Sequence, residues 1–322
     1  MTLETQLKAL LNDPSIACQE QLQSLWSGYG QIIRCQSKAR QQSYIVKVIT
    51  SQAADTHPRG WNTSASHQRK LQSYQVEASF YQDYAGLTDQ QNKTPELIAC
   101  CQTNDGILLV LEDLDAAGYN IRKDIASWHD LTIAIRWLAY FHARFMNCEA
   151  TELWPVGCYW HLATRQDELS AMSASDYKRY AQQLDDKLKN AAFKTLVHGD
   201  AKFENLCFHH NGEAVAAVDF QYVGTGSGVK DLAYLVGSCL KQEQLVEFDP
   251  LILPEYLKHL KQALAHYQVP LDFNALKTET YQLYPIAWAD FYRFLLGWNP
   301  QSWKICQYMK TQSAIGLSLF ES

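Results

Sequence analysis

Apolar and polar residues alternate differently in the two parts of the chain. Up to about residue 113, apolar residues form short runs bounded by turn or polar residues, which is typical of strands. One longer stretch in this part, residues 66–84, has the spacing of a helix instead. The predicted strands are residues 22–26, 31–35, 44–49, 97–102 and 107–112.

After residue 113 the spacing of apolar residues is mainly that of helices. A single short hairpin, at residues 205–221, interrupts the series. Pro285 lies inside the last long apolar stretch and predicts that a continuous helix is broken or kinked there, because proline removes a helical hydrogen bond and clashes with the preceding turn. The predicted helices are residues 128–146, 174–189, 231–240, 254–267, 275–284 and 285–297.

These patterns predict an α+β fold with two lobes. A small sheet-rich N-terminal lobe, residues 1–112, precedes a larger helical C-terminal lobe, residues 113–322, which includes the linker at its start. The length of 322 residues and the hydrophobic content of 47% are sufficient to bury the core of such a protein.

The predicted hairpin brings two oxygen-bearing side chains together. Asn211 and Gly212 form a strong signal for a two-residue turn, in which both residues need a positive φ. Counting outward from this turn puts Asn205 opposite Val218, with Asp219 beside it. An amide and a carboxylate held in this way suit Mg²⁺, which takes its remaining ligands from water and phosphate. We therefore predict a Mg²⁺ site at Asn205 and Asp219.

Asp200 lies five residues before Asn205, on the loop that leads into the hairpin. There it faces the predicted metal site without coordinating it, and is a candidate base for an attacking hydroxyl. For each carboxylate taken alone, the alternative is a turn or a helix cap, where aspartate is common.

Lys47 shares one face of its predicted strand with Ile45 and Ile49, which indicates that its ammonium is buried. A buried ammonium is costly unless it is paired. Glu77 lies on the core-facing stripe of the following helix and needs a partner as well. We predict a Lys47–Glu77 ion pair that holds the ammonium toward nucleotide phosphates; a purely structural salt bridge is the alternative.

Gly28 and Gly30 flank a turn between the first two predicted strands. Such a turn lets backbone N–H groups come close to phosphates. A plain hairpin turn explains the same pair, and only its position upstream of Lys47 favours a phosphate contact.

In chain order, these residues resemble the motifs of the protein-kinase-like fold. The segment His198-Gly199-Asp200-x-Lys202-x-x-Asn205 is similar to the aminoglycoside phosphotransferase and choline kinase branch of that fold. The triplet Asp219-Phe220-Gln221 and the segment 228–234 look closest to its ecdysteroid kinase-like members. The resemblance extends from about residue 25 to residue 240.

This resemblance implies a kinase that transfers the γ-phosphate of ATP to a hydroxyl with the help of Mg²⁺. It also implies that Asp231 braces the loop around Asp200, although a helix N-cap explains Asp231 nearly as well. Two departures from the pattern concern the phosphate loop, which lacks a third glycine, and Gln221, which replaces the usual glycine. The implied roles are Asp200 as base, Lys202 near the γ-phosphate, Asn205 and Asp219 as Mg²⁺ ligands, Lys47 with Glu77 at the α- and β-phosphates, and the backbone from Glu112 to Leu114 at the adenine.

The acceptor is expected to be a small molecule. Only twelve positions separate Asp219 from Asp231, too few for the long segment that positions a protein substrate. Amino alcohols, aminoglycoside-like compounds, sugars and sterols are the candidate hydroxyl acceptors. Trp288 and Asp290 are candidates for an aromatic cage around a cationic acceptor. The alternative is that these aromatics are core and that Asp290 pairs with Arg293 at i, i+3.

Charge and cysteine content limit the expected partners and the expected location of the protein. The net charge of −6 comes without a basic stripe, so neither nucleic acid nor an anionic membrane is an expected partner. No uncharged apolar run has the length of a membrane helix, and the first residues lack the pattern of a signal peptide. Nine cysteines without a CxxC pair favour reduced thiols and a cytoplasmic location. The extra polar stretch at residues 51–69 is either a flap over the nucleotide or a surface loop.

Two other functions remain open at this point. One is a catalytically silent nucleotide-binding protein with a kinase fold, although such proteins commonly lack the base, a metal ligand or the lysine. The other is a metal-dependent phosphohydrolase that uses His198, Asp200 and Asp219, which leaves Lys47 and Glu77 without a role.

Overall fold

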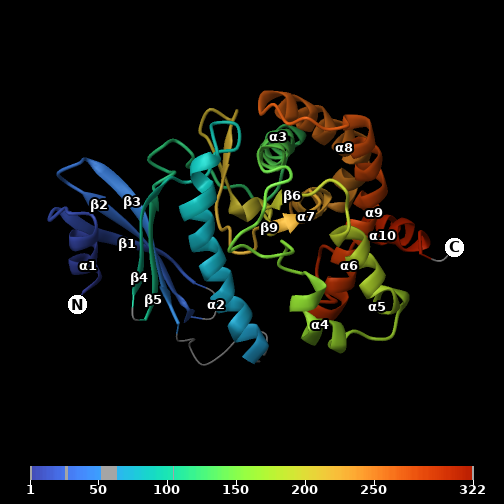
Figure 1. Ribbon diagram of the computed structural model, residues 1–322, viewed down its shortest axis with the longest axis horizontal. Helices are drawn as coiled ribbons and strands as arrows, with labels where there is room; N and C mark the ends of the chain where they lie inside the picture. The colour runs from blue at the N-terminus through green and yellow to red at the C-terminus, as the bar shows by residue number, and fades with distance from the viewer. Residues whose placement is uncertain (1, 26–27, 52–63, 104, 321–322) are drawn as a thin grey trace.

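The computed structural model describes residues 2–25, 28–51, 64–103 and 105–320, and they form two lobes (Figure 1). The N-terminal lobe is built on a five-stranded antiparallel sheet with the strand order β1-β2-β3-β5-β4. Its strands are β1 (Ile16–Ser24), β2 (Gly30–Ser37), β3 (Gln42–Thr50), β4 (Leu97–Thr103) and β5 (Gly106–Glu112).

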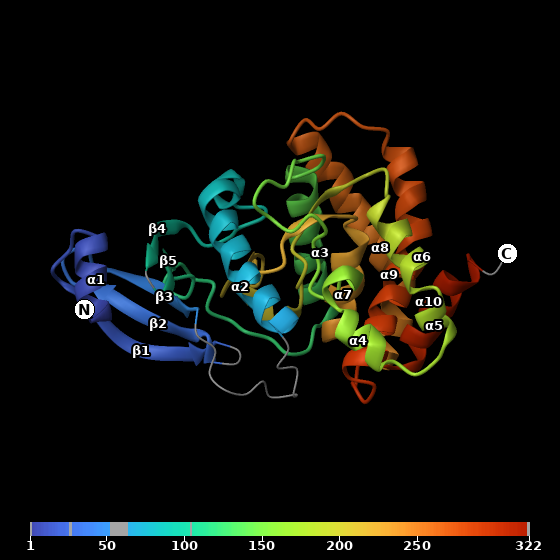
Figure 2. The ribbon, with the colours of Figure 1, turned by 60° about the horizontal axis from the view of Figure 1, so that its bottom comes forward.

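The two faces of this sheet are covered differently. Helix α1 (Leu3–Leu10) packs on the outer face, where Leu7 contacts the side of β3 that carries Tyr44 and Val46. Helix α2 (Ser64–Ser79), which continues into a π-helical turn at Phe80–Tyr84, lies on the other side, between the sheet and the helical lobe (Figure 2). The alternation along β3 therefore directs Lys47 toward α2 and the second lobe, as predicted from the sequence.

The C-terminal lobe is mainly helical. Two short antiparallel pairs of strands, β6 with β9 and β7 with β8, come before α7 along the chain. Its strands are β6 (Thr195–Val197), β7 (Leu206–Phe208), β8 (Val215–Ala217) and β9 (Gly224–Gly226). Its helices are α3 (Trp128–Arg144), α4 (Gln166–Ala171), α5 (Asp176–Arg179), α6 (Ala181–Lys189), α7 (Val229–Cys239), α8 (Gln242–His266), α9 (Phe273–Trp298) and α10 (Gln307–Ser318).

The predicted α+β class with two lobes is confirmed. The exact division between residues 112 and 113 stays a prediction. Among the residues that the structure describes, no helix combines the length and the apolar character needed to cross a bilayer.

Several predictions about individual elements were wrong. The helix predicted at 254–267 begins already at Gln242, and the helix predicted at 174–189 is divided into α5 and α6. The break at Pro285 does not occur, because α9 runs through it and buries apolar residues on both sides of the proline. The first strand begins at Ile16 rather than at residue 22, because β1 is an edge strand with mostly exposed side chains and carries no alternation to detect. The hairpin is not the only strand pair of this lobe, since the three-residue strands β6 and β9 are too short to leave a pattern.

Gly30 begins β2 where the backbone of β3 comes very close. Its φ is +136°, and a Cβ at this position would lie 1.9 Å from the carbonyl oxygen of Val48. We expect Gly30→Ala to lower the free energy of unfolding by about 1–3 kcal/mol through backbone strain and separation of the strands. Urea unfolding would measure the change. Gly86→Ala is the control, since a Cβ there meets nothing within 4 Å; equal losses in both variants would contradict this account.

Candidate functional site

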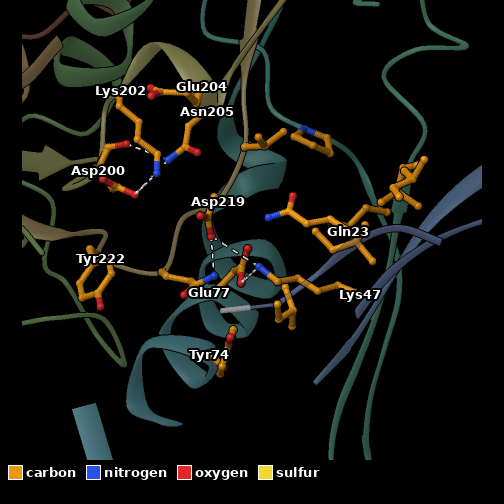
Figure 3. A pocket seen from close by; sticks show the side chains of 18 of the residues that line it. Gln23, Lys47, Tyr74, Glu77, Asp200, Lys202, Glu204, Asn205, Asp219 and Tyr222 are labelled. Carbon is orange, nitrogen blue, oxygen red and sulfur yellow. Dashed lines mark hydrogen bonds and ion pairs between the residues drawn. The ribbon is translucent and has the colours of Figure 1, made fainter. Parts of the chain in front are cut away.

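A cavity of about 950 Å³ lies in the cleft between the two lobes. Its wall is formed by β1, β2, β3 and β5 of the sheet, by α2, and by the segment around the β7–β8 hairpin. Figure 3 shows Lys47 reaching in from the sheet toward Asp219, with Asp200 and Asn205 across from it. Residues far apart in the sequence therefore meet in one place.

Lys47 and Glu77 form the buried ion pair that the sequence predicted. The distance from Lys47 Nζ to Glu77 Oε2 is 2.6 Å, and the residues are 5% and 1% exposed. Burial lowers the pKa of Lys47, but the carboxylates of Glu77 and Asp219 outweigh it and raise that pKa above its usual value. The ammonium is also 3.4 Å from Asp219 Oδ1, so it joins the sheet to the second lobe.

The predicted register of the hairpin is confirmed. Leu206 pairs with Ala217, and the N–H of Val218 donates to the carbonyl oxygen of Asn205 at 3.0 Å. The turn itself differs from the prediction. The N–H of Gly212 donates to the carbonyl oxygen of His209 at 2.9 Å, and Asn211 does not have a positive φ. The loop is wider than two residues but has the same centre, so the pairing is unchanged.

Asn205 and Asp200 are locked to each other. The Asn205 Nδ2 donates to the backbone oxygen of Asp200 at 2.9 Å and to its Oδ2 at 3.1 Å. Because the amide nitrogen is used in this way, the amide oxygen remains as the possible metal ligand of Asn205.

Asp219 has the properties of an ionised ligand. Burial raises its pKa, but Lys47, Lys70 and Lys202 more than offset this, so the pKa lies below the usual value for a carboxyl. Its φ of +67° places it in the left-handed region, which is uncommon for a residue other than glycine and is found at functional sites.

The pKa of Asp200 is shifted in the opposite direction, above the usual value for a carboxyl. Burial raises the pKa of Asp200, as does the charge of Asp219, while Lys202 opposes them with its ammonium 3.6 Å from Asp200 Oδ2. Asp200 and Asp219 are therefore two carboxyls whose environments move their pKa values apart, which indicates that the two groups have different chemical roles.

Asp231 braces the loop before Asp200, as the resemblance implied. Its carboxylate accepts hydrogen bonds from the N–H groups of His198 at 2.6 Å and Gly199 at 2.9 Å. The helix-cap alternative is wrong, because the N-cap of α7 is Gly228 and no side chain caps it. Gly199 has a φ of +79°, and a Cβ there would lie 2.1 Å from the carbonyl oxygen of Tyr222.

The side chain of Gln221, which replaces the usual glycine, makes two hydrogen bonds in the cleft. Its Nε2 donates to Asp219 Oδ1 at 2.5 Å, and its Oε1 accepts from Lys70 Nζ at 2.7 Å. The glutamine thus ties the carboxylate of Asp219 to helix α2.

Among the remaining predicted nucleotide contacts, Glu112 and Leu114 line the cavity. Gly28 and Gly30 lie at the β1–β2 turn but are not among the lining residues, whereas the side chain of Tyr29 between them is. Most of the stretch proposed as a flap, residues 52–63, lies outside the residues that the structure describes.

The aromatic cage at Trp288 and Asp290 is a prediction that the structure contradicts. Both side chains are fully buried and neither lines the cleft. Asp290 Oδ1 accepts from Arg293 Nη2 at 2.7 Å, which is the ion pair given as the alternative. The helical spacing of the aromatics indicated a common face, but that face is core, and spacing alone does not distinguish core from the wall of a cleft.

The sequence analysis missed several residues of the cleft. Arg34 donates to Asp113 at 2.9 Å and to Asp115 at 2.5 Å, which ties the linker to the sheet. Three tyrosines that line the cavity were also missed: Tyr159, Tyr222 and Tyr234, with Arg165 over the ring of Tyr159. Tyr159 lies in the irregular segment before α4 and Tyr222 in the loop between β8 and β9, where no helical or strand period reveals the direction of a side chain.

The donor atoms suit Mg²⁺ better than a transition metal. Among the described residues, no group of three or more histidine, cysteine, aspartate or glutamate side chains is arranged to hold a metal. Asn205 and Asp219 offer one amide and one carboxylate, and Mg²⁺ commonly takes only one or two carboxylates and completes its shell with water and phosphate.

A comparison with models of protein families finds one match. Residues 158–269 match the model of the ecdysteroid kinase-like family. The matched segment is about a third of the chain and includes Asp200, Lys202, Asn205 and Asp219. The resemblance to ecdysteroid kinase-like proteins that the sequence predicted is thus confirmed over this segment.

Solved structures with similar folds include small-molecule kinases. A choline kinase from Streptococcus pneumoniae is 14% identical over 98% of both chains, with a TM-score of 0.49. A Plasmodium vivax ethanolamine kinase is 13% identical over 97% of this chain and 85% of its own, also with a TM-score of 0.49. An aminoglycoside phosphotransferase from Streptomyces rimosus, in complex with ADP and streptomycin, is 14% identical over 89% of this chain and 100% of its own, with a TM-score of 0.47.

At these identities the likeness says nothing about the acceptor of this protein. A search of curated proteins finds no match.

Proposed function

We propose that this protein transfers the γ-phosphate of ATP to a hydroxyl of a small molecule. The observation that carries the proposal is the meeting of the Lys47–Glu77 pair, Asp219 and the Asp200–Asn205 pair in one cleft. Phosphoryl transfer needs positioned groups and neutralised phosphate charge more than covalent chemistry, and this set provides both.

Each residue has one task in this proposal. Lys47, fixed by Glu77, binds the α- and β-phosphates, and Lys202 approaches the γ-phosphate. Asn205 and Asp219 hold Mg²⁺, which would neutralise phosphate charge when bound. Asp200 orients the acceptor hydroxyl and takes its proton late, when the forming ester makes that proton acidic.

The acceptor hydroxyl would lie near Asp200, where Tyr159, Tyr222, Tyr234 and Trp298 line the cavity. We keep amino alcohols, aminoglycosides, sugars and sterols as candidate acceptors.

In the part of the chain that the structure describes, the nine cysteines form no disulfide, which supports the expected cytoplasmic location.

ATP consumption against a panel of these four classes of acceptor tests the proposal. We expect ADP to form only when a suitable acceptor is present, together with a phosphorylated product that mass spectrometry detects. Phosphate release that needs no acceptor would indicate a phosphohydrolase. Nucleotide binding without turnover on any acceptor would favour a catalytically silent protein.

Lys47→Met should lower kcat/KM for ATP about 10- to 100-fold, because hydrogen bonds to charged groups contribute about 1.5–3 kcal/mol. Steady-state kinetics with varied ATP would measure the loss. Lys258→Met is the control: that lysine pairs with Glu255 on the surface of α8, far along the chain from the cleft residues. A Lys47→Met enzyme with wild-type kcat/KM would show that the ion pair is only structural.

Lys202→Met should move the acidic limb of the kcat/KM profile to higher pH. Asp200 acts as a base only when ionised, so activity is lost as the pH falls through its pKa. That pKa is raised by burial and lowered by Lys202, and removal of the ammonium raises it further. A limb that stays in place or moves to lower pH would contradict the assigned pairing.

A further inference from the structure

A second cavity, of about 420 Å³, lies mainly in the helical lobe. It is framed by the segment 154–164, α6, the residue before β6, β9 and the start of α7, and Gln72 of α2 closes it from the N-terminal lobe. None of its lining residues lines the cleft that holds Asp200. It is therefore a separate site, and the proposed phosphoryl transfer does not use it.

Lys230 is the feature of this cavity that needs explanation. The residue is only 2% exposed, and it lines the cavity. Within the described residues its Nζ has no hydrogen bond and no ion pair; it lies 5.8 Å from the centre of the Trp160 ring. A cation–π contact near the limit of its range offsets little of the cost of burying an ammonium. The enclosed side chain of Lys230 thus ends in an ammonium that makes no hydrogen bond or ion pair with the described residues, although its charge acts on the carboxylate of Asp185.

The carboxylate on the cavity wall is already engaged. Asp185 accepts a hydrogen bond from His161 Nδ1 at 3.0 Å. Burial raises the pKa of Asp185, but His161 and the positive charges of Lys230 and Arg293 lower it below its usual value, so the carboxylate stays ionised. The ion pair of Asp185 is with His161 and not with Lys230, so the hydrogen-bonding capacity of the Lys230 ammonium is still available.

The residues of the cavity wall indicate which kind of ligand would bind the ammonium of Lys230. Lys189, which is exposed, and Lys194, which is half-buried, also line the cavity, and Asp185 is the only carboxylate among the described lining residues. The rest of the wall is mainly apolar, with Trp154 and Leu188 buried and Val156 half-buried. A ligand that satisfies both parts carries a negative charge at one end and an apolar body at the other.

We propose that this cavity binds a small organic anion, with a phosphate or carboxylate group at Lys230 and an apolar body against Trp154 and Leu188. The anion supplies the hydrogen-bond partner that Lys230 lacks, and a hydrogen bond between two charged groups is stronger than one between neutral groups.

Calorimetric titration of the full-length protein with phenyl phosphate and with benzoate tests the proposal. Phenol serves as the neutral probe of the same shape. We expect at least one of the two anions to bind and phenol to bind much more weakly. The tighter of the two anions identifies the phosphate or the carboxylate head. Equal binding of phenol, or no binding of either anion, would overturn the proposal.

Three variants locate the binding. Lys230→Met keeps the length of the side chain and should weaken anion binding at least about tenfold. Lys47→Met removes the lysine of the cleft and should leave this binding unchanged, as should Lys277→Met on the exposed face of α9. Unchanged affinity in Lys230→Met, or loss of binding in Lys47→Met, would assign the anion to another place.

Lys194→Met tests the same proposal if Lys230→Met does not fold. Lys194 is half-buried on the cavity wall, and its replacement by methionine should weaken anion binding several-fold without affecting the core. Wild-type affinity in Lys194→Met together with competition by ATP would place the anion in the cleft and contradict the proposal.

Discussion

Asp200→Asn is expected to lower kcat by about 100-fold or more, because a positioned general base contributes about 10²–10⁴-fold to a rate. The substitution removes the charge and proton affinity of the side chain while nearly preserving its shape. The oxygen that remains can still accept the hydrogen bond from Asn205 Nδ2, now 3.1 Å from Asp200 Oδ2. The affinity for ATP should therefore change little, and the loss should appear in turnover.

Single-turnover kinetics with the best acceptor would separate the two effects. Asp186→Asn, on the exposed face of α6, is the matched control and should behave as the wild type. Turnover that survives in Asp200→Asn at the wild-type rate would show that another group accepts the proton. A large loss of ATP affinity would instead indicate that Asp200 helps to hold the metal.

Asp290→Ala is expected to lower the free energy of unfolding by about 3–5 kcal/mol, because it leaves a buried guanidinium without its partner. Arg293 and Asp290 are fully buried, and Asp290 accepts from Arg293 Nε at 2.9 Å and Nη2 at 2.7 Å. Trp160 Nε1 also donates to this carboxylate, at 3.2 Å. Urea unfolding followed by far-ultraviolet circular dichroism would measure the loss.

The double variant Asp290→Leu/Arg293→Met is the informative companion. It removes both charges and fills their space with apolar groups, so it should be much closer to the wild type than Asp290→Ala is. If Asp290→Ala were within about 1 kcal/mol of the wild type, the pair would not stabilise the core as described.

The arrangement of the proposed catalytic residues was predictable because each part of it depends on local rules. The alternation of β3 fixed the direction of Lys47, and the helical stripe of α2 fixed that of Glu77. The position of the Asn-Gly pair was sufficient to set Asn205 against Val218, even though the turn differs in detail. These features need only the period of one element and a count along two strands.

The acceptor end of the cleft was not predictable in the same way. Trp288 and Asp290 show the helical spacing of an aromatic face, but tertiary packing alone decides that this face is core. Tyr159 lines the cavity from an irregular segment, where no period reveals the direction of a side chain. The uninterrupted α9 at Pro285 has a related cause, since burial of both its halves outweighs the lost hydrogen bond.

Titration calorimetry with ATP, in the presence and absence of Mg²⁺, tests the central claim most directly. We predict saturable binding of ATP that Mg²⁺ strengthens in the wild type. In Asp219→Asn, Mg²⁺ should no longer strengthen it, because that variant removes the carboxylate of the proposed metal site. No binding of ATP under either condition would contradict the assignment of this cleft to phosphoryl transfer from a nucleotide.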